Sequence, residues 1–575
     1  MLRTLLLITS LVLIAANACA LEGNSVTVKA VAVTSGETPR GVTIDITVTV
    51  TNGSGKVFVS TGPYTEIDMQ GSARLAAITA CDLLGMDFLK YDFFYEIQAD
   101  APIVGGPSAG AVMTVATIAA LKNLPIRDDV FMTGMIYPDG FIGPVGGLKY
   151  KLEAAAESGG RVFLIPKGQR ITYVEERVVE RVGIVSIVRT KYTKLDLVEY
   201  GRQLGVEVYE VETINDALKF YTGYEIAQAE ISFNPVEYSQ LLKLLAEEMR
   251  KLVDRNAEAE SFFERGAYYT ATSKYFQALI QKYYGEYKRK ITNAQQFDNE
   301  VRSIESEIEN LKEALATKRV GVNTMQIIAA AEERLGEAEL QLEKAKTSND
   351  ADEVLFSLAY ARARVESAKV WLTLLDKFGE DYEVSYEELK RRAEFYVTQA
   401  SSLLIYATSL GGNQLLLSWA EESLIVARNL YSDGMYAGAA FSAIDSMVDS
   451  ALAIEVTYSD LESKIEAARS KAAAAIGEAE KSLTPILPAA YFEYAENLEN
   501  PYFKLLYYKL SERLAKLLSV MSKSHGKAKL VQAKFTPKQE SRVKEIVREV
   551  REIPGFEVAT AVLALAALHL LRRRS

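Results

Sequence analysis

The sequence predicts a chain of two parts, an α+β domain followed by an all-α region. Between positions 25 and 60, apolar and polar residues alternate in three runs, with a turn signal at Asn52-Gly53, and this pattern is typical of β-strands. From about Asn234 onward, apolar residues recur at helical spacing and strand signals are few. The length of 575 residues also exceeds what one hydrophobic core usually serves. We place the α+β domain at 21–224 and the helical domain at 225–545.

The local patterns predict the order of elements in the first domain. Alternating or buried apolar runs indicate strands, and longer runs with helical spacing indicate helices. The expected elements are strands at 25–33, 41–50 and 56–60, a helix at 71–85, a strand at 93–98, a helix at 110–122, a strand at 130–136, a helix at 148–158 and a strand at 161–166.

The helical domain reads as a bundle or an irregular helical-repeat region. Two of its segments, FFERGAYYTATSKYF and LYSDGMYAGAAFSAI, share the spacing Gly-x-Tyr-x-x-Ala at Gly266 and Gly434. This spacing resembles the small-residue contacts of tetratricopeptide-type helical hairpins, although no 34-residue period repeats cleanly.

The first twenty residues resemble a secretory signal peptide. They carry Arg3, an apolar stretch from Leu5 to Ala16 and the small-residue ending Ala18-Cys19-Ala20. Cleavage of 1–20 would leave a mature chain that begins near Leu21. An uncleaved membrane anchor is the alternative.

Residues 554–575 resemble the tripartite C-terminal sorting signal of archaeal surface proteins. Pro554-Gly555-Phe556 opens the segment, a short apolar run follows, and three arginines stand near its end. The resemblance implies recognition by an archaeosortase, removal of the tail and attachment of a lipid, after a linker at 546–553. A retained single-span anchor is the alternative. In both cases we expect the bulk of the chain to lie outside the cell, anchored to the outer face of the membrane.

Composition argues against several kinds of site. The net charge of -11 offers no basic surface for nucleic acid, which we do not expect as a partner. A Ser-His-Asp triad, a Cys-His pair and a zinc site of the usual kind are all disfavoured, because the sequence has two histidines, His525 and His569, and two cysteines, Cys19 and Cys81. We expect no metal and no cofactor, and we expect Cys81 to pack in a core.

The stretch GGPSAGAVM, residues 105–113, places Ser108 at the start of a helical apolar pattern. A serine at such a position is usually a helix cap. Here the neighbouring residues are small, so a substrate backbone could approach, and the main-chain N–H groups of Ser108 and Ala109 could converge on a developing oxyanion. Ser108 is therefore a candidate nucleophile as well as a candidate cap.

A lysine is the candidate base, because histidine is scarce. The stretch GPVGGLKYKLEAA opens a helix that carries Lys149 and Lys151 in its first turn. Leu148 and Lys151 are three residues apart and share a helix face, so Lys151 can point inward while Lys149 stays solvated. Burial would lower the pKa of the inward lysine from about 10.4 toward neutrality, and the neutral amine could then take the serine proton.

Several motifs, in this order, resemble the proteolytic domain of the Lon protease family: GGPSAG, MTG, GPVGGLKYKLEAA and GGRVFLIPKG. With TNGSGKVFVS upstream and VETINDALKFY at the end, the likeness spans roughly residues 25–222. The separation of 43 residues between Ser108 and Lys151 matches the family's serine-to-lysine spacing. The resemblance implies an α+β proteolytic fold in which Ser108 is the nucleophile, Lys151 is the general base and Thr133 is a hydroxyl that orients the lysine amine.

The sequence departs from the family pattern in charge and in length. Gly105 stands where many members have an acidic residue, and Met135 stands where Glu commonly follows Met-Thr-Gly. No G-x-x-x-x-G-K-[ST] motif occurs in the sequence, so the implied protease would act without ATP. Family members often assemble into rings, so the resemblance, and nothing else in the sequence, suggests a homo-oligomer.

The sequence therefore predicts an ATP-independent Ser-Lys endopeptidase that cleaves peptide bonds of extracytoplasmic or membrane-associated proteins. Two alternatives stay open. One is a surface-anchored helical binding or structural protein with a vestigial Lon-like domain, and the other is a dedicated self-processing protease. Asn52 lies in an Asn-Gly-Ser glycosylation sequon, which is compatible with all three.

Overall fold

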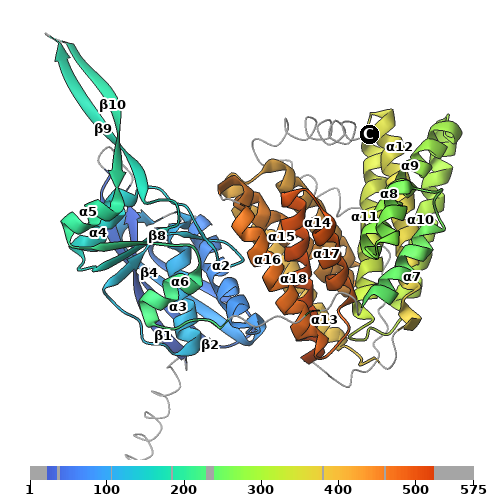
Figure 1. Ribbon diagram of the computed structural model, residues 1–575, viewed down its shortest axis with the longest axis horizontal. Helices are drawn as coiled ribbons and strands as arrows, with labels where there is room; N and C mark the ends of the chain where they lie inside the picture. The colour runs from blue at the N-terminus through green and yellow to red at the C-terminus, as the bar shows by residue number, and fades with distance from the viewer. Residues whose placement is uncertain are drawn as a thin grey trace, which may run out of the picture. The chain divides into compact units, whose positions relative to one another are not determined.

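The computed structural model contains two compact units, residues 1–228 and 229–575 (Figure 1). The first is a mixed α/β unit built on a β-sheet, and the second is made of helices, which confirms the fold class in its broad form. The structure describes residues 23–34, 39–65, 67–104, 106–182, 185–227, 233, 238–377, 381–458 and 461–523. The predicted signal peptide, linker and sorting signal, with Cys19 and both histidines, lie outside the described residues.

A seven-stranded mixed sheet forms the centre of the α/β unit, in the order β11-β8-β5-β1-β2-β4-β3. The two pairs β1–β2 and β2–β4 are antiparallel, and the remaining neighbours are parallel. The strands are β1 (Gly23–Val33), β2 (Gly41–Asn52), β3 (Val57–Thr65), β4 (Tyr91–Val104), β5 (Val130–Met132), β8 (Val162–Pro166) and β11 (Glu207–Val211).

The strand expected at 130–136 is interrupted, and this corrects the sequence-based prediction. β5 ends at Met132, and the chain resumes as β6 (Met135–Ile136), which pairs with β7 (Ile142–Gly143) in a separate two-stranded sheet. The reason is a competing set of hydrogen bonds, because the backbone N–H of Gly134 donates to Ser108 O at 2.9 Å instead of continuing the β5 ladder.

Three helices pack around the candidate site and fix its position. α2 (Ile67–Leu84) packs against α3 (Gly110–Lys122), whose residues from 110 to 120 are all buried, as expected of a helix that is apolar on every side. α4 (Leu148–Glu157) places Leu148 and Leu152 in a core that also contains Phe131 of β5. Cys81 is a free, buried cysteine within α2, as predicted.

A two-stranded antiparallel ribbon projects from the α/β unit (Figure 1). It consists of β9 (Ile171–Val182) and β10 (Val185–Asp196), and the sequence analysis did not anticipate it. Near its base, Tyr173 and Tyr192 are 67% and 63% exposed. The ribbon is followed by α5 (Leu197–Leu204) and, after β11, by α6 (Ile214–Thr222).

The second unit is helical throughout its described part. Its helices are α7 (Ser239–Arg250), α8 (Ala257–Glu264), α9 (Tyr268–Lys290), α10 (Ala294–Ala316), α11 (Met325–Thr347), α12 (Ala351–Leu372), α13 (Tyr386–Ser409), α14 (Gln414–Ser432), α15 (Tyr436–Tyr458), α16 (Glu462–Glu480), α17 (Ile486–Asn497) and α18 (Pro501–Lys523).

One helix in the described part is long and apolar enough to cross a membrane, namely residues 436–456 of α15, with a mean hydropathy of 1.3. Of its most apolar window, 94% is buried inside the helical unit. That burial is typical of a core helix in a bundle, so α15 adds nothing to the expected membrane anchor.

The two Gly-x-Tyr-x-x-Ala segments form the same helical turn. Gly266 follows α8 and Gly434 follows α14, with φ angles of 83° and 79°. In both turns the next helix begins two residues later, and its first tyrosine contacts an aromatic ring of the preceding helix with centroids 5.2 Å apart. A Cβ at either glycine would meet no atom within 4 Å, so the backbone conformation, and not space, requires glycine.

We therefore expect Gly434→Ala to lower the free energy of unfolding of the helical unit by about 1 to 2 kcal/mol, because a left-handed conformation is strained for alanine. Gly285→Ala, inside α9 and with only a side-chain atom of Arg289 4.0 Å away, should change stability in the opposite direction by up to about 1 kcal/mol. Urea unfolding followed by circular dichroism measures both. A neutral result for Gly434→Ala would contradict the strain argument.

Candidate active site

Ser108 lies in a short 3-10 turn, Pro107–Ala109, between the end of β4 and the start of α3. Gly106 enters this turn with a φ of 95°. Ala109, and not Ser108, occupies the N-cap position of α3, and no side chain caps that helix. Ser108 is half-buried. Capping therefore does not account for this serine.

A backbone clasp holds the Ser108 turn against the end of β5. Gly134 N donates to Ser108 O at 2.9 Å, and Ala111 N donates to Gly134 O at 3.1 Å. Both crossing points need glycine because the chains approach closely. A Cβ on Gly110 would lie 2.7 Å from a methyl carbon of Ile136, and one on Gly134 would lie 2.3 Å from a methyl carbon of Ile142.

Lys151 projects from the first turns of α4 into the interior. It is 4% exposed, and its Nζ donates to Thr133 Oγ1 at 3.2 Å. Burial lowers the pKa of Lys151 to about 8. The positive end of the helix dipole also disfavours a charged amine so close to the helix start. The neutral amine is therefore accessible near physiological pH.

Lys149 points to solvent, as the helix-face argument predicts. Its side chain is 32% exposed and lies 3.8 Å from Glu153 one turn later. Leu148, by contrast, is buried with Lys151 on the inward face. The packing of Leu148 and Leu152 fixes the rotation of α4, and this rotation directs Lys151 inward.

Thr133 connects the two candidate residues. Its hydroxyl accepts the bond from Lys151 Nζ and lies 3.4 Å from Ser108 O, to which it donates. Its own backbone N–H donates to Leu164 O of β8 at 3.1 Å, so the sheet fixes its position. The threonine is completely buried. Its hydroxyl can therefore orient the lysine amine and hold that amine at a fixed position relative to the Ser108 backbone.

The remaining candidates are placed as follows. Ala109 is buried and precedes α3 directly, where main-chain N–H groups point away from the helix and can receive an anion. Met135 is a buried residue of β6, and Gly105 lies outside the described residues. Asn52 is exposed at the end of β2, which leaves it accessible to a glycan.

Gln169 is a residue that the sequence analysis missed. Its side-chain amide accepts from Val145 N and donates to Val145 O, both at 2.9 Å. Val145 lies two residues before Gly147, the N-cap of α4, so this double bond steadies the loop that starts the lysine helix. Gln169 directly follows the PKG end of the quoted motif, but no local pattern tells which backbone group a loop amide will meet.

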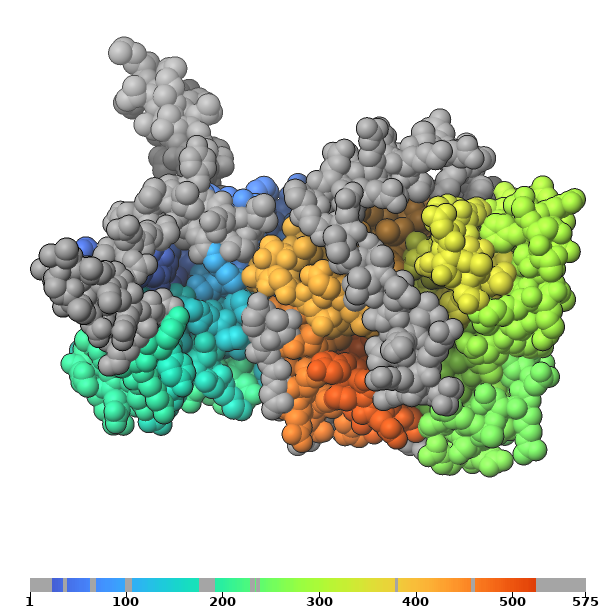
Figure 2. Space-filling model, turned by 90° about the horizontal axis from the view of Figure 1, so that it is seen from above, coloured from blue at the N-terminus to red at the C-terminus, as the bar shows by residue number. Residues whose placement is uncertain are grey.

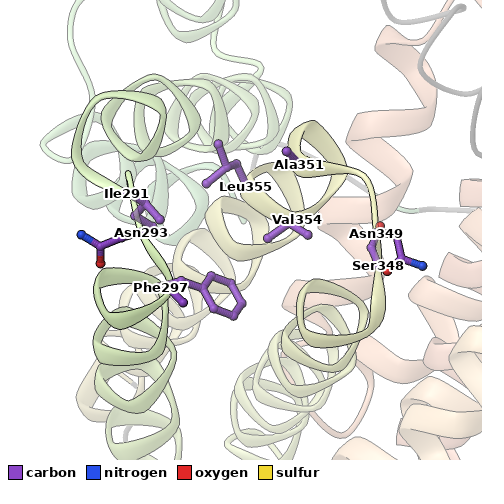
Figure 3. A pocket seen from close by; sticks show the side chains of 9 residues that line it. Ile291, Asn293, Phe297, Ser348, Asn349, Ala351, Val354 and Leu355 are labelled. Atoms are coloured by element: carbon purple, nitrogen blue, oxygen red, sulfur yellow. The ribbon is translucent and has the colours of Figure 1, made fainter.

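A shallow apolar groove of about 310 Å³ lies in the helical unit and not beside Ser108. Figure 3 shows Phe297, Val354 and Leu355 around it, from α10 and α12. Among the residues that the structure describes, no group of three or more His, Cys, Asp or Glu is arranged to hold a metal ion.

The fold brings a serine turn, a buried threonine and a buried lysine together, an arrangement that is compatible with the class of serine hydrolases that use a lysine base. Comparison with known proteins points to one family. Residues 22–192 match the Lon protease (S16) C-terminal proteolytic domain. This match covers most of the α/β unit, up to β10, and does not extend to the helical unit.

Individual relatives agree with that match. The chain is 32% identical over 183 residues to the Lon protease of Fervidobacterium nodosum, which is 31% of this chain and 21% of the relative. It is 32% identical over 169 residues to the archaeal Lon protease of Thermococcus kodakarensis, or 29% of this chain and 26% of the relative. A match to the Lon protease of Buchnera aphidicola is 41% identical over 133 residues, or 22% and 17%. The chain thus spans about a fifth of the length of these relatives.

The lowered pKa of Lys151 has a consequence for stability. A base whose folded pKa lies below its unfolded value costs stability below the folded pKa, and the cost is relieved as pH rises toward the unfolded value, here from about 8 to 10.5. Lys151→Met removes this cost. We expect Lys151→Met to exceed the parent in unfolding free energy by up to about 3 kcal/mol at pH 7 and by little at pH 10.5.

Urea unfolding of the two proteins at pH 7 and pH 10.5 measures this difference. Lys149→Met serves as the matched control and should show no such pH-dependent difference, because Lys149 is partly exposed. A constant difference between the parent and Lys151→Met at both pH values would contradict the buried, weakly basic amine.

Proposed function

We propose that the α/β unit is an ATP-independent serine endopeptidase with a Ser108–Lys151 dyad. The observation that carries this proposal is the buried Lys151 amine, whose pKa is lowered to about 8. This amine donates to the Thr133 hydroxyl, which in turn donates to Ser108 O. The match of residues 22–192 to the Lon proteolytic domain supports peptide bonds as the substrate.

The proposed reaction proceeds through an acyl-enzyme. The neutral amine of Lys151 takes the proton of Ser108 Oγ as that oxygen attacks the peptide carbonyl carbon. The main-chain N–H groups of Ser108 and Ala109 stabilise the resulting oxyanion. The lysine ammonium then gives its proton to the leaving amine nitrogen as the C–N bond breaks. A water molecule, deprotonated by Lys151, hydrolyses the ester and restores the serine.

The proposed location outside the cell rests on the signal-peptide-like pattern of residues 1–20 and the sorting-signal-like pattern of residues 554–575. A secreted chain held at the outer face of the membrane would meet little ATP, which fits the missing ATP-binding motif. Its proposed substrates are flexible segments or misfolded stretches of extracytoplasmic and membrane-associated proteins, which an ATP-independent protease can cleave without unfolding them first. The helical binding protein and the self-processing protease are the outcomes against which this proposal is tested.

The decisive experiment compares the full chain with Ser108→Ala and Lys151→Met in cleavage of casein without ATP. We expect the parent to cleave and both variants to lose at least about 1000-fold in rate, because removal of a nucleophile or its base leaves only binding and oxyanion contributions. Lys149→Met is the control that keeps activity. Equal inertness of all four proteins would support the helical binding protein. A precursor that accumulates in Ser108→Ala and Lys151→Met, but not in the parent or in Lys149→Met, would support self-processing.

The pH dependence of the parent provides an independent check. Since Lys151 must be neutral to act as base, kcat/KM should rise about tenfold per pH unit below pH 8 and level off above it. Lys151→Arg should be inactive at every pH, because a guanidinium is not deprotonated. A profile that keeps rising to the ordinary lysine pKa of about 10.4 would mean that the base is solvated.

A further inference from the structure

The helical unit contains an internal repeat that extends beyond the two glycine turns. Around Gly266 and Gly434 the backbone hydrogen bonds correspond one for one. Gly266 N donates to Phe263 O and Gly434 N to Tyr431 O, both at 3.1 Å, and the next residue in each turn donates to the carbonyl four places before the glycine. The helices that follow, α9 and α15, each have 23 residues.

The following helices correspond in order as well. α10, α11 and α12 come after α9, and α16, α17 and α18 come after α15. The packing is shared, since α11 contacts α12 as α17 contacts α18, and α7 contacts α9 as α13 contacts α15. The first six helices and the last six are therefore two versions of one arrangement.

The two versions exchange equivalent contacts. Glu332 of α11 accepts from Gly438 N, in the first turn of α15, at 2.7 Å. Glu493 of α17 accepts from Thr270 N, in the first turn of α9, at 3.0 Å, and from Tyr269 N at 3.2 Å. Thr270 and Gly438 each stand four residues after the turn glycine, so a helix of each half supplies the carboxylate that caps the other half.

Equivalent residues also touch each other directly. Asn323 Oδ1 accepts from Thr484 N at 2.7 Å, and Gln326 Oε1 accepts from Leu487 N at 2.9 Å. Each of these pairs is separated by 161 residues in sequence, the separation that also relates Glu332 to Glu493. Contacts between equivalent positions occur where a two-fold axis passes. Figure 1 shows α11 and α17 where the green-to-yellow and the orange-to-red helices meet.

We propose that the helical unit is an intramolecular dimer, in which residues 238–377 and 381–523 are equivalent six-helix halves and each half is the docking partner of the other. The interface is isologous: the starts of α11 and α17 meet near the axis, α11 packs on α15, and α17 packs on α9. Each half thus presents the same surface, a helix start that lacks its own side-chain cap and a glutamate that caps a copy of that start.

The electrostatics of the two glutamates support their equivalence. Burial raises the pKa of both carboxyls, to about 7 for Glu332, and in both cases the backbone N–H groups that they bind act in the opposite direction. The halves differ elsewhere. α16 packs along α18, whereas α10 lies in looser contact with α12, and the apolar groove of Figure 3 opens between these two helices of the first half. On the face seen in Figure 2, the first half is coloured green to yellow and the second half orange to red.

The experiment uses the full chain with a cleavage sequence for a specific protease inserted after Lys377. Cleavage should leave the two pieces bound to each other under native conditions, as sedimentation would show. Glu332→Ala and Glu493→Ala should each raise the dissociation constant of the cut pieces about 10- to 100-fold, because each leaves buried backbone N–H groups without an acceptor. The effects should agree within about threefold.

Glu332→Gln and Glu493→Gln are the matched controls, because the amide oxygen still accepts, and they should lose much less affinity than the alanine variants. Circular dichroism before cleavage establishes that each variant is folded. Two results would overturn the proposal: separation of the pieces of the parent on cleavage, or a large effect of one glutamate with none of the other. Neither readout depends on protease activity, so the outcome is independent of the proposed dyad.

Discussion

The burial of one weakly basic amine is the constraint on which the candidate site depends. Burial disfavours the charged form of Lys151 and lowers its pKa to about 8, so the amine gives up its proton more easily than a solvated lysine does. The same property would let it act as the base of the proposed dyad. The packing of α4 keeps the lysine buried despite this loss of hydration. Leu148 and Leu152 pack into the core and fix the rotation of the helix so that Lys151 faces inward. The helix therefore serves the chemistry through its packing.

Residues at the end of a sheet strand link the serine turn to the lysine. Thr133 is held by β8 through its backbone and bonds to both sides through its hydroxyl, and Gly134 clasps the Ser108 turn. This clasp requires the strand to break after Met132, because a continuous strand would use the backbone N–H and C=O of Gly134 for its own ladder. A local break in a predicted strand thus coincides with the candidate site.

Sequence reasoning found the parts of the site that have a local signal. The small residues around Ser108 and the three-residue spacing of Leu148 and Lys151 follow from side-chain size and helix geometry, and the structure agrees on the inward and outward lysines. It missed Gln169 and the break after Met132, because both depend on partners that are distant in sequence. The ribbon was missed for a related reason, since β9 and β10 pair with each other and not with a strand of the seven-stranded sheet.

In the helical unit the sequence showed the repeated spacing but suggested small-residue contacts at Gly266 and Gly434, where the structure has open, left-handed turns, and it did not predict the pairing of helices. The Gly-x-Tyr-x-x-Ala spacing fixes a left-handed glycine and the start of the next helix, and these are local events. Which helix lies against that start is decided by surface complementarity, and amphipathic patterns of neighbouring helices are too alike to reveal it. Glu332 and Glu493 are therefore invisible as caps in the sequence. The repeat also explains why no 34-residue period appears, because the repeating element is a group of six helices.

A comparison of buried lysines shows what sets Lys151 apart. Lys312 of α10 is equally buried, but it bonds to Glu339 and Asp433, both at 2.7 Å, and although burial opposes its charge the two carboxylates raise its pKa. Within the described residues, no ion pair involves Lys151, and its amine donates to a neutral hydroxyl, that of Thr133. Burial with a carboxylate locks a lysine in its charged form and makes it a structural tie, whereas burial beside a hydroxyl leaves the amine free to exchange its proton. Since the two lysines are equally buried, the identity of the neighbour is what distinguishes Lys151, the proposed base, from Lys312.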